Sequence, residues 1–302
     1  MGLFGSFQNA GPGINPYAPK KKPFFRYWEL LWRNFGKLLG LNIIITLCHI
    51  PLLGSLIVYM ETHNNLTNTV ALIMLIIQFF MEGPIIAGAT RVLRLIVLDK
   101  AFFLGEEFKK GFTRNLGSSF LIWLIDTIMI MSLYTGYQIY PQLAEKMDSK
   151  IVYVPYVLSI AIAIILLFMN YYLMPLTVVT KLTKRNVFKN SFMLTALSPK
   201  QCLLSTVCGL LFLASIVIPL LFTGYFLFLA VFYPAAFIGY TVMFIHYPVI
   251  QRYVINPYYE ETGEQNPEEE ELPPEEERVF TDRGKSSEPV QKQKAKKGKV
   301  IS

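Results

Sequence analysis

Apolar residues along this chain gather in long runs, separated by shorter polar and basic segments. The longest run, from Gln201 to Gln251, contains no Asp, Glu, Lys or Arg, and Lys200 and Arg252 bracket it. One membrane helix needs roughly 20 apolar residues, and this run has 51. We therefore predict two membrane helices here, joined by a tight turn at Phe222-Thr223-Gly224-Tyr225, with Gly224 as the pivot.

Four further apolar runs precede this one, each long enough for one membrane helix. They extend over about Lys37–Tyr59, Thr69–Ala89, Ser118–Gln138 and Val152–Val179. The pattern predicts an all-α integral membrane protein with six transmembrane helices. Residues 23–35 differ, because apolar and charged residues alternate there at helical spacing, with Phe24, Trp28, Leu31 and Phe35 on one face. That spacing predicts an amphipathic helix lying at the membrane interface.

Short matching segments predict an internal repeat. Arg33-Asn34-Phe35-Gly36 precedes the first span, and Arg114-Asn115-Leu116-Gly117 precedes the third; Leu197-Ser198-Pro199-Lys200 precedes the fifth without the same letters. Each even-numbered span carries a proline toward its expected cytoplasmic end, and proline kinks a membrane helix; these prolines are Pro84, Pro175 and Pro248. We predict three two-helix repeats, each led by an interfacial helix. Such repeats occur in transporters and also in proteins that transport nothing.

Composition supports the membrane assignment. Hydrophobic residues make up 53% of the 302 residues and charged residues only 16%, with a mean hydropathy of +0.41. The net charge of +7 falls mainly between the spans, which indicates membrane orientation rather than nucleic-acid binding. Of the 28 Lys and Arg residues, 26 lie in the segments expected on one side. We predict a multi-pass protein of the cell membrane with both termini in the cytoplasm.

The ends of the chain differ in composition from the six-helix membrane domain, which we place at residues 23–259. Residues 1–22 are rich in Gly, Pro and Asn, lack the apolar core of a cleavable signal peptide, and are expected to be flexible. Residues 260–302 contain ten glutamates between Glu260 and Glu277, followed by a basic stretch from Arg283 to Lys299, so we expect a disordered cytoplasmic tail. That tail is either solubilising, or its final lysines contact anionic lipid.

The segment from Glu82 to Gly117 reads EGPIIAGATRVLRLIVLDKAFFLGEEFKKGFTRNLG. Its Gly-Pro, Ala-Gly and Arg-x-x-Arg elements resemble the YesL family of bacterial membrane proteins (domain of unknown function 624), as do Lys189-Asn190-Ser191-Phe192 and Asn256-Pro257-Tyr258-Tyr259. The resemblance covers about residues 24–260 and leaves out the acidic tail. It implies a link to carbohydrate uptake in Gram-positive bacteria, without an established activity or catalytic residues.

Ionisable residues inside a membrane span need a reason, because each costs roughly 2.5–3.5 kcal/mol on insertion scales. The candidates for a polar site within or beside the predicted spans are His49, Glu82 and Asp126. They predict a proton or substrate path, with Asp126 and His49 as partners and Glu82 at the kink before Pro84. Alternatively, Asp126 and Glu82 accept hydrogen bonds from neighbouring helices, or pair with Arg91 or Arg94.

Asn170, Tyr171 and Tyr172 suit either a sugar-binding cavity or ordinary contacts between helices. The sequence shows no nucleophile beside its base, no phosphate-binding loop and no metal-ligand spacing. We therefore expect neither an enzyme nor a bound cofactor or metal. Cys48, Cys202 and Cys208 are expected to be packing residues.

Two functions remain open at this point. The protein is either related to transport, as an accessory to carbohydrate uptake, or a membrane scaffold or regulator that binds a partner through its cytoplasmic segments and tail. The expected partners are the lipid bilayer and a carbohydrate-uptake system or another membrane protein, with no nucleic acid.

Overall fold

A computed structural model describes residues 21–61, 64–222, 234–266 and 268. Residues 23–266 belong to one compact unit. Within the described ranges all regular structure is helical: α1 (Pro23–Arg33), α2 (Phe35–Cys48), α3 (Ile50–Glu61), α4 (Asn65–Val97), α5 (Leu104–Arg114), α6 (Leu116–Met147), a short 3-10 helix (Lys150–Tyr153), α7 (Val154–Val179), α8 (Lys184–Leu197), α9 (Pro199–Phe222), α11 (Pro234–Ile250), a π-helix (Gln251–Ile255) and α12 (Asn256–Thr262).

Several of these helices are long and apolar enough to cross a membrane. In the described part of the chain they are α4, α6, α7 and α9, or five spans if the bent pair α2–α3 is counted as one. The predicted turn at Gly224 lies outside the described residues. The 17-residue helix α11 follows that gap, so the count of six spans stays a prediction. Most of the predicted tail also falls outside the described part, although α12 runs to Thr262.

The first predicted span is not one continuous helix, which corrects the expectation for Lys37–Tyr59. It breaks at His49 into α2 and α3, whose axes differ by 47°. Pro51 explains the break, because it has no N–H for the carbonyl of Leu47 and its ring clashes with that carbonyl. The His49 side chain stabilises the exposed end of α2, where Nδ1 lies 2.7 Å from the carbonyl oxygen of Ile45.

Three short helices, α1, α5 and α8, each lead directly into a long helix. The amphipathic α1 ends at Arg33, so Phe35 belongs to α2, contrary to the prediction. Its Leu30 and Leu31 are buried, whereas most of its aromatic rings remain exposed: Phe24, Phe25, Trp28 and Trp32. One edge of α1 thus packs on the protein, and its aromatic edge is free to lie at the membrane surface.

The three junctions between short and long helices share one hydrogen-bond pattern. At each, a polar side chain donates to the carbonyl oxygen four residues earlier: Asn34 to Leu30 (3.1 Å), Asn115 to Gly111 (2.9 Å) and Ser198 to Leu194 (2.6 Å). The same three residues accept a backbone N–H from four residues later. These bonds add to the backbone hydrogen bonds where the chain passes from the short helix to the long one. We call Asn34, Asn115 and Ser198 the joints.

The core is formed where the long helices meet near the joints, an end of the molecule that we call the base. There α4, α7 and α11 all contact one another. Most buried residues of α4 lie between Gly83 and Ile96, and those of α7 lie between Tyr172 and Val178. A Cβ on Gly83 would lie 2.5 Å from the backbone oxygen of Ser119, so only glycine permits this approach of α4 to α6.

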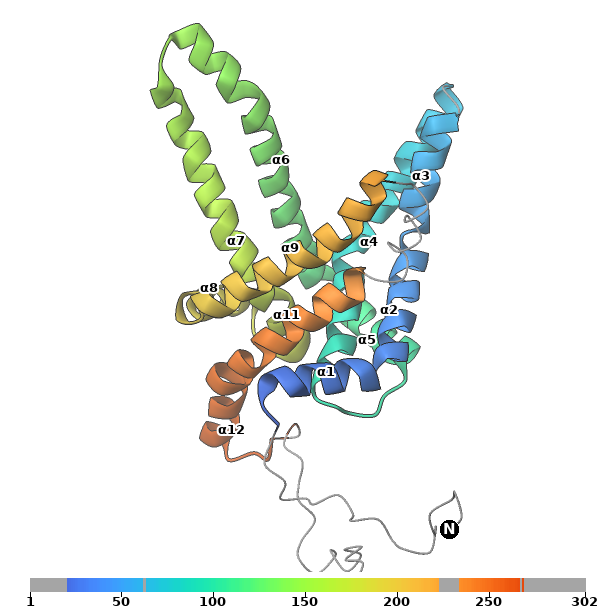
Figure 1. Cartoon of the computed structure of the whole chain (residues 1–302), viewed down its shortest axis with the longest axis vertical. Helices are drawn as coiled ribbons and strands as arrows, with labels where there is room; N and C mark the ends of the chain where they lie inside the picture. The colour runs from blue at the N-terminus through green and yellow to red at the C-terminus, as the bar shows by residue number, and fades with distance from the viewer. Residues whose placement is uncertain (1–20, 62–63, 223–233, 267, 269–302) are drawn as a thin grey trace, which may run out of the picture. The chain divides into compact units, whose positions relative to one another are not determined.

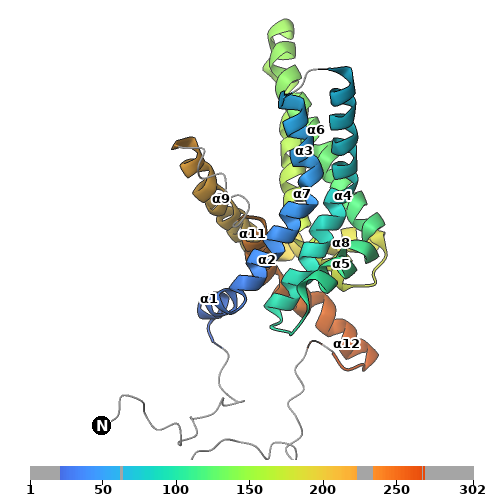
Figure 2. The same cartoon turned by 90° about the vertical axis from the view of Figure 1, so that its right-hand side faces the viewer.

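Away from the base the hairpins separate. In Figure 1 the α3–α4 pair and the α6–α7 pair rise to opposite sides, and in Figure 2 α9 leans away from both pairs. At the base, hydrogen bonds also join α1 to α11. The Tyr27 hydroxyl of α1 lies 2.9 Å from Thr241 Oγ1 of α11. Tyr240 of α11 donates to the backbone oxygen of Tyr27 (2.8 Å).

Candidate functional site

The break at His49 places an imidazole against a carboxylate of the neighbouring helix. His49 Nε2 lies 3.3 Å from Glu82 Oε1 and 3.2 Å from Oε2. Glu82 sits on α4 two residues before Pro84. Both side chains are largely covered, with exposed fractions of 24% and 20%. Two of the predicted site residues therefore form one pair, at an irregularity in each helix.

The bonds of the His49 ring fix how many protons the pair holds. Its Nδ1 faces the carbonyl oxygen of Ile45, which can only accept, so Nδ1 carries a hydrogen. Its Nε2 faces Glu82, so a hydrogen bond there requires one further proton, on the imidazole or on the carboxyl group. The pair therefore holds one proton that can reside on either partner.

Gln78 extends this pair by one helical turn. Its Nε2 donates to Glu82 Oε2 at 2.7 Å. The side-chain oxygen of Gln78 is buried and has no hydrogen-bond partner among the described residues. A buried polar atom without a partner is unfavourable, so the bond to Glu82 fixes the Gln78 side chain at a cost.

A cavity of about 300 Å³ lies beside these groups. Its lining combines apolar and aromatic side chains with the polar cluster: His49, Leu52, Leu75, Gln78, Phe79, Glu82 and Trp123. The indole N–H of Trp123 is buried and, within the described ranges, has no acceptor. The cavity thus lies next to the shared proton of the His49–Glu82 pair.

Asp126 belongs to a different pair. Its Oδ1 accepts a hydrogen bond from Asn170 Nδ2 of α7 at 2.7 Å, whereas the ring of His49 bonds to Glu82. The structure thus gives Asp126 and His49 separate partners. Arg91 bonds to Glu107 at 2.7 Å and Arg94 donates to Tyr247 at 2.8 Å, so these arginines act at the base.

Tyr171 and Tyr172 connect α7 to the third hairpin. The Tyr171 hydroxyl lies 2.8 Å from Thr206 Oγ1, and the Tyr172 hydroxyl bonds to Ser198 at the third joint. Both rings pack on the buried His246, with centroid distances of 4.9 and 4.8 Å. These are contacts between helices, in line with the second interpretation of the two tyrosines.

The hydrogen bond between Ser205 and His246 was not predicted. Ser205 Oγ lies 2.9 Å from His246 Nε2, and both residues are buried. His246 stands two residues before Pro248, the same offset as Glu82 before Pro84. This shared position before a proline is the feature of the sequence that could have marked His246 as a residue contacting a neighbouring helix.

The fold and the site define a class: an all-helical protein with several membrane-length helices and polar pairs between them. No group of three His, Cys, Asp or Glu in the described part of the chain could hold a metal ion. The chain matches no known family model, no curated protein and no solved structure.

Proposed function

We propose that this protein takes part in membrane transport, and that the His49–Glu82 pair binds and releases a proton as a small polar solute occupies the adjacent cavity. The observation that supports this most is the broken helix, because its break places His49 against Glu82. Discontinuous membrane helices commonly form the binding sites of transporters. Intramembrane ionisable pairs commonly serve as proton sites.

Proton counting adds to the proposal. A solute that donates a hydrogen bond to Glu82 would favour its carboxylate form, and one that accepts from it would favour the acid. Solute binding would thus move the shared proton between Glu82 and His49 or release it. Gln78 and Trp123 also line the cavity and would surround the solute.

We also propose six spans in three repeats, with both termini in the cytoplasm. The common hydrogen bonding at the three joints supports the repeats. The distribution of 26 of 28 basic residues supports the orientation. Membership of the YesL family remains a proposal from the motifs, and it makes neutral sugars the first solutes to test.

Proteoliposomes test the transport proposal. The purified protein is reconstituted with a pH-sensitive dye inside, and proton entry is driven by a potassium diffusion potential, with and without a panel of neutral sugars outside. We expect solute-dependent proton entry for the natural protein and the level of empty liposomes for Glu82→Gln. Ser205→Ala is the control, because it removes a buried polar contact far from the cavity lining and should retain activity. Equal proton entry by Glu82→Gln and the natural protein would contradict the proposal.

A scaffold function is the second candidate. An apolar 18-residue window of α7 has no buried residue. The surface of this part of α7 is therefore available to a membrane helix of another protein. A photo-crosslinking residue at Leu158 or Ile162 should then capture a protein partner in native membranes. Crosslinks to lipid alone would argue against a scaffold that uses this face.

A further inference from the structure

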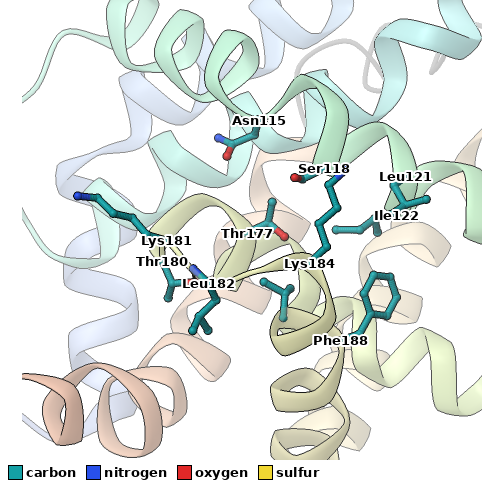
Figure 3. A pocket seen from close by; sticks show the side chains of 11 residues that line it. Asn115, Ser118, Leu121, Ile122, Thr177, Thr180, Lys181, Leu182, Lys184 and Phe188 are labelled. Atoms are coloured by element: carbon teal, nitrogen blue, oxygen red, sulfur yellow. Dashed lines mark hydrogen bonds between the residues drawn. The ribbon is translucent and has the colours of Figure 1, made fainter.

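A second cavity lies at the base, between the beginning of α6, the end of α7 and the beginning of α8 (Figure 3). Its volume is about 170 Å³, which is room for a small polar group rather than a single water. The polar part of its lining comes from all three helices and the α7–α8 loop: Asn115, Ser118, Thr177, Thr180, Lys181 and Lys184. None of this lining belongs to the His49–Glu82 site.

Among the residues that the structure describes, no acidic side chain neutralises the positive charge at this cavity. No carboxylate lines it, and the segment from Lys181 to Lys200 contains five basic residues and no acidic one. Within the described residues, neither Lys181 nor Lys184 has an ion-pair partner. Arg91, by contrast, forms an ion pair with Glu107. The cavity is therefore suited to bind an anionic group.

The available hydrogen-bond donors converge on the same space. Figure 3 shows the Lys184 side chain running toward Ser118, while Lys181 extends outward. The Ser118 hydroxyl has no partner among the described residues. Thr177 and Thr180 differ, since their hydroxyls donate to carbonyls of their own helix.

The beginning of α8 adds further donors. Thr183 precedes α8 without capping it through its side chain, so the first N–H groups of this helix keep free hydrogens. Such a helix end, together with an ammonium and a hydroxyl, matches the oxygens of a phosphate group.

The position of the cavity indicates where such a phosphate would come from. Farther along α8, the apolar residues Phe192, Met193 and Leu197 are more than half exposed. The membrane-length helices α7 and α9 flank α8 on either side in the chain. A helix with this composition, between two spans, lies at headgroup depth.

We propose that this cavity binds the phosphate group of an anionic phospholipid. The lipid would join α6, α7 and α8, and so connect the second hairpin to the third. This site is independent of the proposed transport function.

Native mass spectrometry of the full-length, delipidated protein in detergent tests the proposal. Phosphatidylglycerol and phosphatidylcholine are titrated separately. We expect preferential binding of phosphatidylglycerol, weakened about 30-fold by the double change Lys181→Gln and Lys184→Gln, since each lysine near an anionic headgroup contributes appreciably. The double change to arginine should retain binding.

The matched control is Lys146→Gln with Lys150→Gln, which alters the net charge equally at the far end of the α6–α7 hairpin. It should leave lipid binding unchanged. Inorganic phosphate and glycerol 3-phosphate are then added as competitors, to distinguish a lipid from free phosphate as the ligand. If neither displaces phosphatidylglycerol, the result supports a lipid site. If either displaces it fully at low concentration, the cavity is a site for free phosphate instead. Equal binding of the two lipids, or equal loss in the control, would overturn the proposal.

Discussion

At the scale of single residues, the described part of each hairpin holds a polar contact between its two arms. These contacts are His49 with Glu82, Asn170 with Asp126, and Ser205 with His246. In a lipid environment a polar side chain has few alternative partners, so each contact joins its hairpin, although by only about 0.6 kcal/mol on average. The first of them lines a cavity, and the second and third each include a buried polar atom without a partner among the described residues, Asn170 Oδ1 and His246 Nδ1.

Glu107 outside the membrane provides a pH-dependent contribution to stability. Burial alone would raise the pKa of its carboxyl group, but hydrogen bonds from Lys110 and Arg91 outweigh burial and lower that pKa. A lowered pKa stabilises the folded state above the ordinary glutamate pKa, and this stabilisation is lost as the pH falls through the folded-state pKa.

We therefore expect the melting temperature of the detergent-solubilised protein to fall between pH 7 and about pH 3.5. Glu107→Gln should lower the melting temperature at pH 7 and reduce its fall on acidification. Glu145→Gln is the control, because Glu145 is exposed on the far end of α6. Identical acid profiles for Glu107→Gln and the natural protein would refute this role of Glu107.

Gly83 sets how closely α4 approaches α6. Gly83→Ala places a Cβ 2.5 Å from the Ser119 oxygen, and such overpacking destabilises by about 1–3 kcal/mol. Gly117→Ala is the matched control, since nothing lies within 4 Å of its Cβ position, and alanine should be neutral or stabilising there. Thermal unfolding in detergent measures both variants. The prediction is wrong if the two melting temperatures are equal.

Among the elements, the pair α2–α3 shows how one proline shapes a site. Pro51→Ala restores the missing N–H and should straighten the 47° bend. Spin labels at Phe35 and Tyr59 would then move apart by roughly 3 Å, from the rise of 1.5 Å per residue along both arms. Pro141→Ala, within α6, should leave that distance unchanged. An unaltered distance in Pro51→Ala would mean that other contacts hold the bend.

Hydrophobic patterning predicted the helical class and the approximate places of most long helices, because lipid requires continuous apolar runs. It missed the break at His49, because the apolar run there has the length of one continuous span. Whether the proline in this run bends or breaks the helix depends on the backbone geometry, which the pattern does not show. It named His49 and Glu82 but paired His49 with Asp126. The partner depends on which helix faces which, and no single sequence displays that.

For the whole molecule, the orientation can be measured directly. In a background without Cys48, Cys202 and Cys208, Asp148→Cys at the α6–α7 turn should react with an impermeant thiol reagent in intact cells. Thr183→Cys, at the base, should react only after lysis. Labelling of both positions before lysis, or of neither, would contradict the proposed topology.

Because the core lies at the base, a rotation of a hairpin about its joint would move the far end of that hairpin most. The helix α6 has 32 residues, a length of about 48 Å at 1.5 Å per residue. A rotation of 10° at Asn115 would therefore displace Met147 by roughly 8 Å. The bond from Asn115 to Gly111 lies at the pivot of this rotation, so a small rearrangement at the base would become a large displacement at the far end of the hairpin.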